Sequence, residues 1–291
     1  YALCIYDKQA QKAWLCRDRF GIKPLYVYRS DTQLAFASEM ASLPPLCDQP
    51  RSLNWEPIKE FAFYGTTLGE QTLYSNITKL KPGTYIEVDT QSLAIKQETY
   101  WSMEDVKPRH SKDPVKDVRE LLEKAVARQL VSDVPVGVFL SGGIDSSAVT
   151  AFASKHYSGT LNTYSVGFDF DKGVNELPKA KGIAEKFGTN HHEMRISGYD
   201  LVDVVQKMVD HHDHPFSDAA NIPLFLLSEK VKQEGSAKVV LQGDGGDELF
   251  GGYRRHSLLS KASLPLTRVL AKIGAPLVNL INVDSPLYRR I

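Results

Sequence analysis

The feature that most constrains this chain is an apolar run that ends in a glycine turn and then changes to helical spacing. Residues 134–140 read Val-Pro-Val-Gly-Val-Phe-Leu, which is typical of a buried strand, and the polar turn Ser141-Gly142-Gly143 follows. From Asp145 onward the spacing predicts a helix. A strand that leads through glycines into a helix start gathers backbone N–H groups at one point, which favours phosphate binding.

Two well-known phosphate fingerprints are absent from this turn. The pattern G-x-x-x-x-G-K-[ST] does not occur, and no G-x-G-x-x-G follows the strand. A phosphate turn without lysine needs another countercharge, and Asp145 is a suitable Mg²⁺ ligand because such sites combine one or two carboxylates with substrate phosphates. The hydroxyls of Ser141, Ser146 and Ser147 can donate further hydrogen bonds. The simpler alternative is an ordinary strand–turn–helix with a serine-rich cap.

The second part of the chain alternates between strand and helix patterns. Strands are expected near residues 135–140, 162–167, 191–195 and 238–242, and helices near 145–156, 175–187, 198–212, 221–234 and from Asp247. This alternation predicts an α/β fold with a doubly wound parallel sheet. Ligands in such sheets sit beyond the carboxyl ends of the strands, so we expect Ser141 and Gly243 to meet at one site. Asp145 and Asp247 would then hold one Mg²⁺, although an N-cap role alone would explain Asp247.

The first hundred residues are predicted to be mostly β. Strands are expected at 1–6, 13–17, 25–28 and 34–37, a hairpin at 84–88 and 93–97, and one helix at 55–64. Residues 102–113 have a linker composition, and we place the domain boundary there, with domains at 1–105 and 112–291.

A helix is predicted to follow the linker, with Asp113 as its N-cap and Pro114 in its first turn. Its apolar residues recur at helical spacing, which predicts one buried face made of Val115, Val118, Leu121, Leu122, Ala125 and Val126. A helical tail with proline breaks is expected from residue 258 onward.

Composition excludes several classes of protein. The 291 residues carry 35 basic and 35 acidic side chains, which argues against a general nucleic-acid or membrane-surface binder. No apolar run is long enough to span a bilayer, and no signal peptide opens the chain. The three cysteines, Cys4, Cys16 and Cys47, have no metal-ligand spacing and form no even disulfide set, so a reducing cytoplasm is the expected location.

Two histidine clusters are interpreted as structural rather than metal-binding. Residues 210–214 read Asp-His-His-Asp-His, which resembles a metal site, but a helix end with capping histidines is the favoured interpretation. Residues 191–193 read His-His-Glu within an expected strand, and we assign them no ligand role.

Several motifs together resemble one enzyme family. Residues 141–147 (SGGIDSS) look like the pyrophosphate-binding loop of ATP pyrophosphatases that form acyl-adenylates, and residues 241–253 (LQGDGGDELFGGY) resemble the second signature of glutamine-hydrolysing asparagine synthetases. Residues 17–26, 37–39 and 80–83 resemble the later part of that family's glutaminase domain. The resemblance runs from Tyr1 to about Tyr253 in the family's order.

The resemblance implies a fold and a reaction. The fold is a parallel, adenine-nucleotide α-hydrolase-like sheet preceded by part of an antiparallel α+β N-terminal-nucleophile-type domain. The reaction converts aspartate to asparagine through an acyl-adenylate and releases AMP and pyrophosphate, with ATP and Mg²⁺ required and ammonia taken from glutamine in the intact parent. The alternatives are a related amidotransferase acting on another carboxylate and a nucleotide-binding fragment without turnover. Small molecules are the expected partners, together with a possible homodimer.

The resemblance also assigns roles to residues. Asp244 is the expected catalytic residue near the ammonia attack, where some relatives carry Glu; a turn residue is the alternative. Leu140 and Val166 would flank the adenine, with core packing as the alternative, and the backbone of Gln242 and Gly243 would contact the nucleotide. The expected nucleotide-binding set is Leu140, Ser141, Gly142, Gly143, Ile144, Asp145, Ser146, Ser147, Val166, Gln242 and Gly243.

The sequence contains only some of the residues that the family uses to bind the acceptor and glutamine. Residues 215–223 lie where acceptor contacts are expected, but they lack the arginine that some asparagine synthetases carry there, so aspartate is the default acceptor. The chain begins with Tyr inside an expected strand, and we expect it to be a fragment that lacks the family's N-terminal cysteine nucleophile and does not hydrolyse glutamine. Cys4 is expected in the core, and Arg17, Asp18 and Glu39 are expected to be structural.

Overall fold

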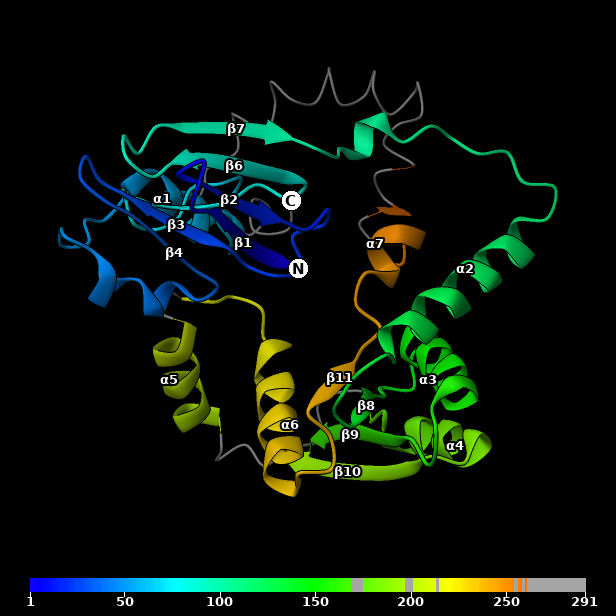
Figure 1. The fold of residues 1–291 in the computed structure, drawn as a ribbon. Coiled ribbons are helices and arrows are strands. Elements are labelled where there is room, and N and C mark those ends of the chain that lie inside the picture. Colours follow the sequence, from blue (N-terminus) through cyan, green and yellow to red (C-terminus); the bar gives the residue numbers. More distant parts are fainter. Residues whose placement is uncertain (169–174, 197–200, 213–214, 254–255, 258–259, 261–291) are drawn as a thin grey trace, which may run out of the picture. The chain divides into compact units, whose positions relative to one another are not determined.

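The computed structural model describes residues 1–168, 175–196, 201–212, 215–253, 256–257 and 260 (Figure 1). These residues form two compact units. The first unit contains residues 1–122, 166–168, 194–196, 201–212 and 215–234, and the second contains 123–165, 175–193, 235–253, 256–257 and 260. Because the first unit gathers three separate stretches of chain, the predicted boundary between residues 105 and 112 stays a prediction.

The first unit is built on two antiparallel sheets (Figure 1). One sheet has the order β1-β2-β6-β7, and its strands are β1 (Ala2–Asp7), β2 (Lys12–Arg17), β6 (Thr84–Asp89) and β7 (Ile95–Thr99). The other has the order β4-β3-β5, with β3 (Tyr26–Arg29), β4 (Leu34–Ala37) and β5 (Ile77–Lys79). The predicted strands and the hairpin are confirmed, whereas β5 was missed because its three residues are too short to show alternation.

One core cluster joins these two sheets. Leu15 and Ile86 of the four-stranded sheet pack with Val27 of the three-stranded sheet, and the cluster is completed by Leu25, Leu80 and Val88. In β6 the burial alternates along the strand, as expected for a strand with one buried face. Short helices connect the strands: η1 (Met40–Ser42), η2 (Pro44–Leu46), α1 (Trp55–Tyr64) and η3 (Met103–Asp105).

The expectation that Cys4 is a core residue was wrong. Cys4 lies in β1, which is an edge strand of its sheet, and the residue is exposed. Five of the six β1 residues are exposed, because the strand has a neighbour on one side only among the described residues. An apolar run predicts a strand but does not say whether that strand lies at the centre or the edge of its sheet.

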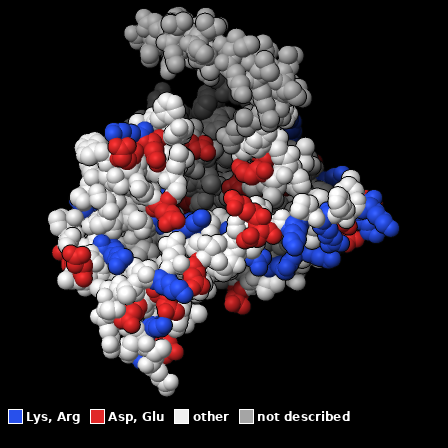
Figure 2. Space-filling view, turned by 90° about the horizontal axis from the view of Figure 1, so that it is seen from above, with Lys and Arg blue, Asp and Glu red and all other residues white. Residues whose placement is uncertain are grey.

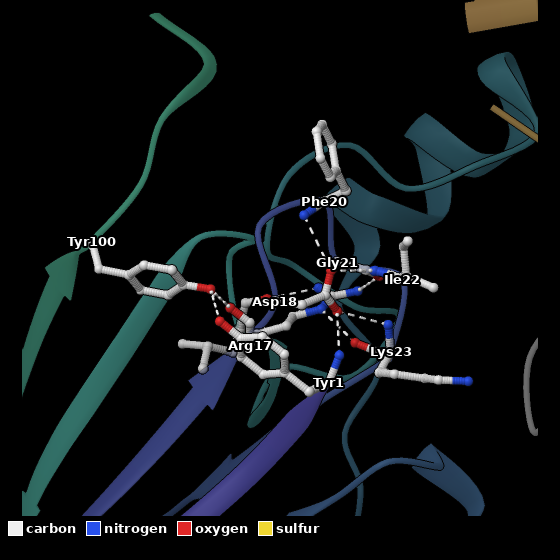
Figure 3. Close-up of polar contacts among 9 residues, drawn as sticks. Tyr1, Arg17, Asp18, Phe20, Gly21, Ile22, Lys23 and Tyr100 are labelled. Atoms are coloured by element: carbon white, nitrogen blue, oxygen red, sulfur yellow. Dashed lines mark hydrogen bonds and ion pairs between the residues drawn. The ribbon is translucent and has the colours of Figure 1, made fainter. Parts of the chain in front are cut away.

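A charged turn after β2 anchors the first unit, and Figure 3 shows its contacts. The Arg17 guanidinium donates to the carbonyl oxygens of Lys23 (2.9 Å), Leu80 (2.7 Å) and Gly21 (2.8 Å). The backbone of Gly21 is left-handed, with φ of 65°, and a Cβ there would lie 3.0 Å from the Arg17 Cζ. All three hydrogen bonds of the Arg17 guanidinium are donated to backbone carbonyl oxygens. The structural role predicted for this residue is therefore confirmed.

Asp18 organises the same turn from the inside. Its buried carboxylate accepts hydrogen bonds from the backbone N–H groups of Phe20 (3.1 Å), Ile22 (3.0 Å) and Lys23 (2.9 Å). Burial opposes ionisation, but the hydrogen bonds from the backbone amides of Lys23 and Ile22 favour the charged form, and the pKa of Asp18 is lowered below its usual value. The charged form of Asp18 therefore stabilises the folded unit.

A parallel sheet lies mainly in the second unit, and the last residues of two of its strands, 166–168 and 194–196, are grouped with the first unit (Figure 1). The strand order is β10-β9-β8-β11, with β8 (Val136–Phe139), β9 (Asn162–Phe168), β10 (Asn190–Ile196) and β11 (Val239–Leu241). Strand β8 pairs in parallel with both β9 and β11, which confirms the predicted α/β class. The helices α3 (Ile144–His156), α4 (Leu177–Phe187) and α7 (Gly246–Phe250) follow β8, β9 and β11 in the chain.

Helix α2 (Pro114–Gln129) begins where the sequence predicts but does not bury the predicted face. The Asp113 carboxylate accepts a hydrogen bond from the backbone N–H of Lys116 (3.1 Å), which is an N-cap contact. Of the apolar set, only Val126 is buried, whereas Val115 is 80% and Leu121 is 59% exposed. Helical spacing fixes which side chains share a face, but it does not determine whether another element covers that face.

The remaining helices of the first unit form a pair. Helices α5 (Leu201–His212) and α6 (Asn221–Glu234) pack through Val204, Met208 and Leu226 around Ile196. Helix α5 ends at His212, in agreement with a helix end in the 210–214 cluster, and residues 213–214 lie outside the described residues. Most of the tail predicted to be helical from residue 258 also lies outside them. No helix within the described ranges is long and apolar enough to cross a membrane.

We expect Asp18→Asn to lower the free energy of unfolding by about 2 kcal/mol at pH 7, because an amide cannot accept all three backbone N–H groups. A lowered folded-state pKa means that this contribution is present above the unfolded pKa, about 3.9, and is lost as pH falls through the folded value. Urea unfolding at pH 7 and pH 2.5 tests this. The exposed Asp31→Asn serves as control, and an Asp18→Asn effect of equal size at both pH values would contradict the assignment.

Candidate functional site

The turn after β8 is tied firmly to the neighbouring strand. Leu140 is buried, and its backbone N–H donates to the carbonyl of Tyr164 (2.8 Å). The hydroxyl of Ser165 donates to the Leu140 carbonyl. Leu140 also packs on Ala180 and Ala184 of α4, so the core-packing interpretation of this residue holds, and its contact with an adenine stays a prediction.

The shape of the turn requires glycine at position 142. Gly142 has a left-handed backbone with φ of 79°. A Cβ at this position would lie 2.8 Å from the Lys179 Cβ and 2.9 Å from the Ala180 backbone nitrogen, so the turn packs directly against the first half of α4. The sequence singled out the glycines, but it did not indicate that α4 is what they contact.

The Ser146 hydroxyl holds the turn together. It accepts a hydrogen bond from the Ser141 backbone N–H (3.2 Å) and donates to the Gly143 carbonyl (3.3 Å), and the side chain is 6% exposed. The Ser141 hydroxyl in turn accepts from the Gly143 backbone N–H (3.2 Å). Ser146 is therefore engaged within the turn. The Ser141 hydroxyl also contacts the Ser146 hydroxyl (2.9 Å), and because Ser146 donates to Gly143, Ser141 is the donor in this contact. Ser147 is half-buried, and the direct role of all three hydroxyls toward a ligand stays a prediction.

Helix α3 presents its N-terminus at this turn. The helix begins at Ile144, and its N-cap residue Gly143 provides no side-chain hydrogen bond. The first N–H groups of a helix lack partners within the helix, so an anion can be bound there by backbone donors alone. Ile144 points away from the protein at 89% exposure, and Asp145 is half-buried in the first helical turn.

A second turn, residues 242–245 after β11, meets the first. A Cβ at Gly243 would lie 2.8 Å from the Ser146 backbone nitrogen and 2.9 Å from the Asp145 Cβ. At Gly246 a Cβ would lie 2.4 Å from the Asp145 Cγ. These contacts bring together two turns that are 98 positions apart in the sequence, counted from residue 145 to residue 243, at the carboxyl ends of the paired strands β8 and β11.

The acidic residues of the second turn occupy distinct positions. Asp244 is exposed, and its carboxylate accepts a hydrogen bond from the Gln242 side-chain amide (2.5 Å). Asp247 lies in the first turn of α7, whose N-cap is Gly245, so the N-cap interpretation of Asp247 was wrong. The Asp247 carboxylate lies over Gly252, where a Cβ would be 1.8 Å from its Oδ1.

The carboxylates of Asp145 and Asp247 belong to adjoining turns, because the Asp145 carboxylate touches Gly246, the residue before Asp247. Mg²⁺ prefers one or two carboxylates together with phosphate oxygens and waters, and these two residues are suitable donors. No group of three or more His, Cys, Asp or Glu side chains that could hold a metal occurs within the described part of the chain. Two carboxylates would need further ligands from a bound phosphate to hold an ion, and the metal assignment stays a prediction.

The side chain of Val166 packs in a different core cluster from that of Leu140. It packs on the cluster of Ile196, Val204, Met208 and Leu226 in the first unit. Val166 is therefore a core-packing residue, as the alternative interpretation predicted. Its proximity to an adenine stays a prediction.

The segment expected to contact the acceptor is joined to the first unit. The Ser217 hydroxyl donates to the Gly65 carbonyl (2.7 Å) at the end of α1, and Phe216 packs beside the α5–α6 core. The Asp218 carboxylate accepts from the Ala220 backbone N–H (2.9 Å), just before α6 begins. No sequence pattern indicated this link, since the two partners of the Ser217 hydrogen bond are 152 positions apart.

The charged surface contains both signs. Figure 2 shows Lys and Arg side chains and Asp and Glu side chains on the same face of the described residues. This mixed distribution agrees with the zero formal net charge of the sequence.

Comparison with known families gives two matches. The model described as asparagine synthase matches residues 117–281, and the model described as glutamine amidotransferase domain matches residues 1–101. The two matched regions together contain all of the residues in the two converging turns and the turn after β2.

Named relatives agree with these matches. A putative asparagine synthetase (glutamine-hydrolyzing) 2 of Methanocaldococcus jannaschii is 32% identical over 260 residues, covering 88% of this chain and 50% of the relative. Asparagine synthetase (glutamine-hydrolyzing) 1 of Bacillus subtilis is 34% identical over 255 residues, covering 87% of this chain and 39% of the relative. Asparagine synthetase (glutamine-hydrolyzing) 3 of Arabidopsis thaliana is 31% identical, covering 87% and 40%. The chain thus spans half or less of the length of these relatives.

We expect Gly243→Ala to destabilise the second unit by about 1–3 kcal/mol, because the added Cβ collides with the backbone of Asp145 and Ser146. Gly182→Ala is the matched control: it lies within α4, nothing lies within 4 Å of its Cβ, and removing a helical glycine stabilises by about 0.5–1 kcal/mol. Urea unfolding of both variants measures the difference. Equal behaviour of the two variants would mean that the turns do not touch in solution.

Proposed function

Because the chain belongs to the asparagine synthase family, we propose that it is the catalytic part of an ATP-dependent, amide-forming ligase that converts aspartate to asparagine. The observation that carries this proposal is the contact of the Asp145 side chain with Gly243 and Gly246. This contact joins a helix N-terminus, which suits phosphate, to a turn that contains Asp244 and Asp247.

The proposed reaction has two steps. A carboxylate oxygen of aspartate attacks the α-phosphorus of ATP, the bond from that phosphorus to the bridging oxygen breaks, and pyrophosphate leaves. Ammonia then attacks the carbonyl carbon of the acyl-adenylate, AMP leaves, and the nitrogen loses a proton. The first step is needed because a free carboxylate has no adequate leaving group.

The residues of the first turn are proposed to bind the departing pyrophosphate. The backbone N–H groups at the start of α3 and the Ser147 hydroxyl would donate hydrogen bonds to it, while the hydroxyls of Ser141 and Ser146 hold the turn in shape. The Ser141 hydroxyl would reach the pyrophosphate only by exchanging its bond to Ser146. Donors that are fixed before the reaction stabilise developing charge without reorganisation, which is among the larger contributions to catalysis. Gly142 and Gly243 keep the backbone close enough for this arrangement.

The acidic residues are proposed to serve two purposes. Asp145 and Asp247 would hold Mg²⁺, which neutralises charge on the pyrophosphate leaving group. Asp244 would accept a proton or stabilise positive charge near the attacking ammonia, and the Gln242 amide orients its carboxylate through the 2.5 Å hydrogen bond. The residues Leu140 and Val166 are proposed to flank the adenine.

Residues 1–101 are proposed to belong to a glutamine amidotransferase domain that supplies ammonia, as their match to that family model suggests. Within the described part of the chain, Arg17 and Asp18 act on backbone groups of their own turn, so we assign them a structural rather than a glutamine-binding role.

A second candidate is nucleotide binding without turnover, because the backbone donors at the start of α3 suit a phosphate whether or not a reaction follows. The two candidates differ in one measurement. A ligase releases pyrophosphate when ATP, Mg²⁺, ammonium and aspartate are present together, whereas a binding module retains ATP and releases none.

We expect Asp145→Ala to reduce aspartate-dependent pyrophosphate release by a factor of at least about 100, because a ligand of the phosphate-bound ion is lost. The matched control is Asp133→Ala, an exposed acidic residue just before β8 that belongs to neither turn. Pyrophosphate is measured by a coupled assay, and ATP binding by calorimetry. Wild-type release in Asp145→Ala would overturn the role of this carboxylate, whereas binding without release in the unaltered chain would favour the second candidate.

We expect aspartate to support the fastest release when it is compared with glutamate, malate and succinate at equal concentration. An acceptor site that recognises both the α-amino group and the side-chain length rejects analogues that leave its polar groups unpaired. Identification of the product by mass spectrometry distinguishes amide from hydrolysis. Faster release with another carboxylate, together with its amide, would replace aspartate as the acceptor.

A further inference from the structure

A separate pocket lies between α4 and the start of β10. Its volume is about 340 Å³, and it is lined by Lys181, Ala184, Glu185, Thr189, His191 and Glu193, all of them in the second unit. This volume is at the small end of the range of about 300–1,000 Å³ for ligand sites. None of these residues belongs to the two turns proposed to bind ATP.

A chain of hydrogen bonds determines which nitrogen of His191 carries the proton. The Thr189 hydroxyl donates to the Ala184 carbonyl (3.4 Å), so it accepts at its 2.8 Å contact with the Thr163 hydroxyl. Thr163 has then used its only proton and must accept at its 2.9 Å contact with the His191 Nδ1. With this set of donors we assign the proton of His191 to Nδ1 and the lone pair to Nε2.

The Nε2 atom of His191 is buried and has no hydrogen-bond partner among the residues that the structure describes. The His191 side chain is 10% exposed. The nearest charged acceptor, Oε1 of Glu193, is 3.9 Å from it, which is too far for a direct hydrogen bond. Burial lowers the pKa of His191, and the nearby His192 and Lys181 act in the same direction while Glu193 opposes them, so the imidazole stays neutral near pH 7.

The Nε2 atom of His191 and the carboxylate of Glu193 are both hydrogen-bond acceptors, so a donor placed between them could bind to both. An ammonium group has three N–H donors, and it can reach both the imidazole nitrogen and a carboxylate that are 3.9 Å apart. Glu185 adds a second carboxylate to the wall, and Lys181, one helical turn earlier on α4, adds an ammonium that attracts a negative group. The pocket therefore carries complementary charges for a small molecule with both signs.

We propose that this pocket binds a free α-amino acid, with its ammonium group between His191 Nε2 and the Glu193 carboxylate and its carboxylate toward Lys181. The site is independent of the proposed ligase reaction, because it uses none of the residues assigned to ATP.

The test uses the whole 291-residue chain labelled with ¹⁵N, with glycine as the probe. Two-bond ¹H–¹⁵N spectra report the tautomer of each of the eight histidines, and the His191 signals are identified by their loss in His191→Gln. We expect the Nδ1–H tautomer of His191 and an upfield shift of its Nε2 signal as glycine is added. Acetate lacks the ammonium group and methylammonium lacks the carboxylate, so we expect both to bind more weakly than glycine.

The variants assign the contacts. We expect Glu193→Gln to weaken glycine binding about tenfold, because one charge-assisted hydrogen bond is lost. Lys181→Met should weaken it about threefold, as an exposed charge contributes less. Lys186→Met, on the same helix but outside the pocket, is the control and should leave binding unchanged. Asp145→Ala should also retain glycine binding, which separates this site from the proposed nucleotide site.

Three results would overturn the proposal. One is an Nε2–H tautomer of His191. The second is a His191 spectrum that does not respond to glycine, which would mean that water alone fills the pocket. The third is a glycine response that is unchanged in Glu193→Gln and Lys181→Met.

Discussion

The contact of the Asp145 side chain with the backbone of Gly243 and Gly246 is the interaction on which the candidate site depends. It exists because β8 and β11 are parallel neighbours, so that the turns after both strands leave the sheet at the same edge. The approach is so close that a Cβ at either glycine would collide with the Asp145 side chain. Glycine in this second turn is therefore a packing requirement as well as a feature of turn geometry.

That contact brings hydrogen-bond donors with positive field close to negatively charged carboxylates. The N-terminus of α3 offers backbone donors with positive field, whereas Asp145, Asp244 and Asp247 add negative charge beside it. An anionic nucleotide alone would be repelled by these carboxylates, and a divalent cation would reconcile the two. The hydroxyl of Ser146 keeps the donors in place, because it is bonded within the turn and buried.

Much of the fold could be predicted because its helices and strands carry strong local patterns. The apolar runs ending at Leu140 and Leu241 and the helical spacing after Asp145 all gave elements that the structure contains. The failures share one physical cause. Cys4 is exposed at a sheet edge, Val115 is exposed on an uncovered helix face, and Asp247 follows an N-cap glycine, and each depends on neighbours that local spacing does not specify.

The amino-acid sequence alone shows which residue types stand after each strand, since glycines, hydroxyls and carboxylates in those turns can be read directly and their chemistry follows from their groups. What those groups face depends on the folded chain: Gly142 lies against α4, Gly246 lies against Asp145, and His191 lines a pocket. The reason is that residue chemistry is local, whereas contacts between positions as distant as 145 and 243 are set by the order and direction of strands in the sheet.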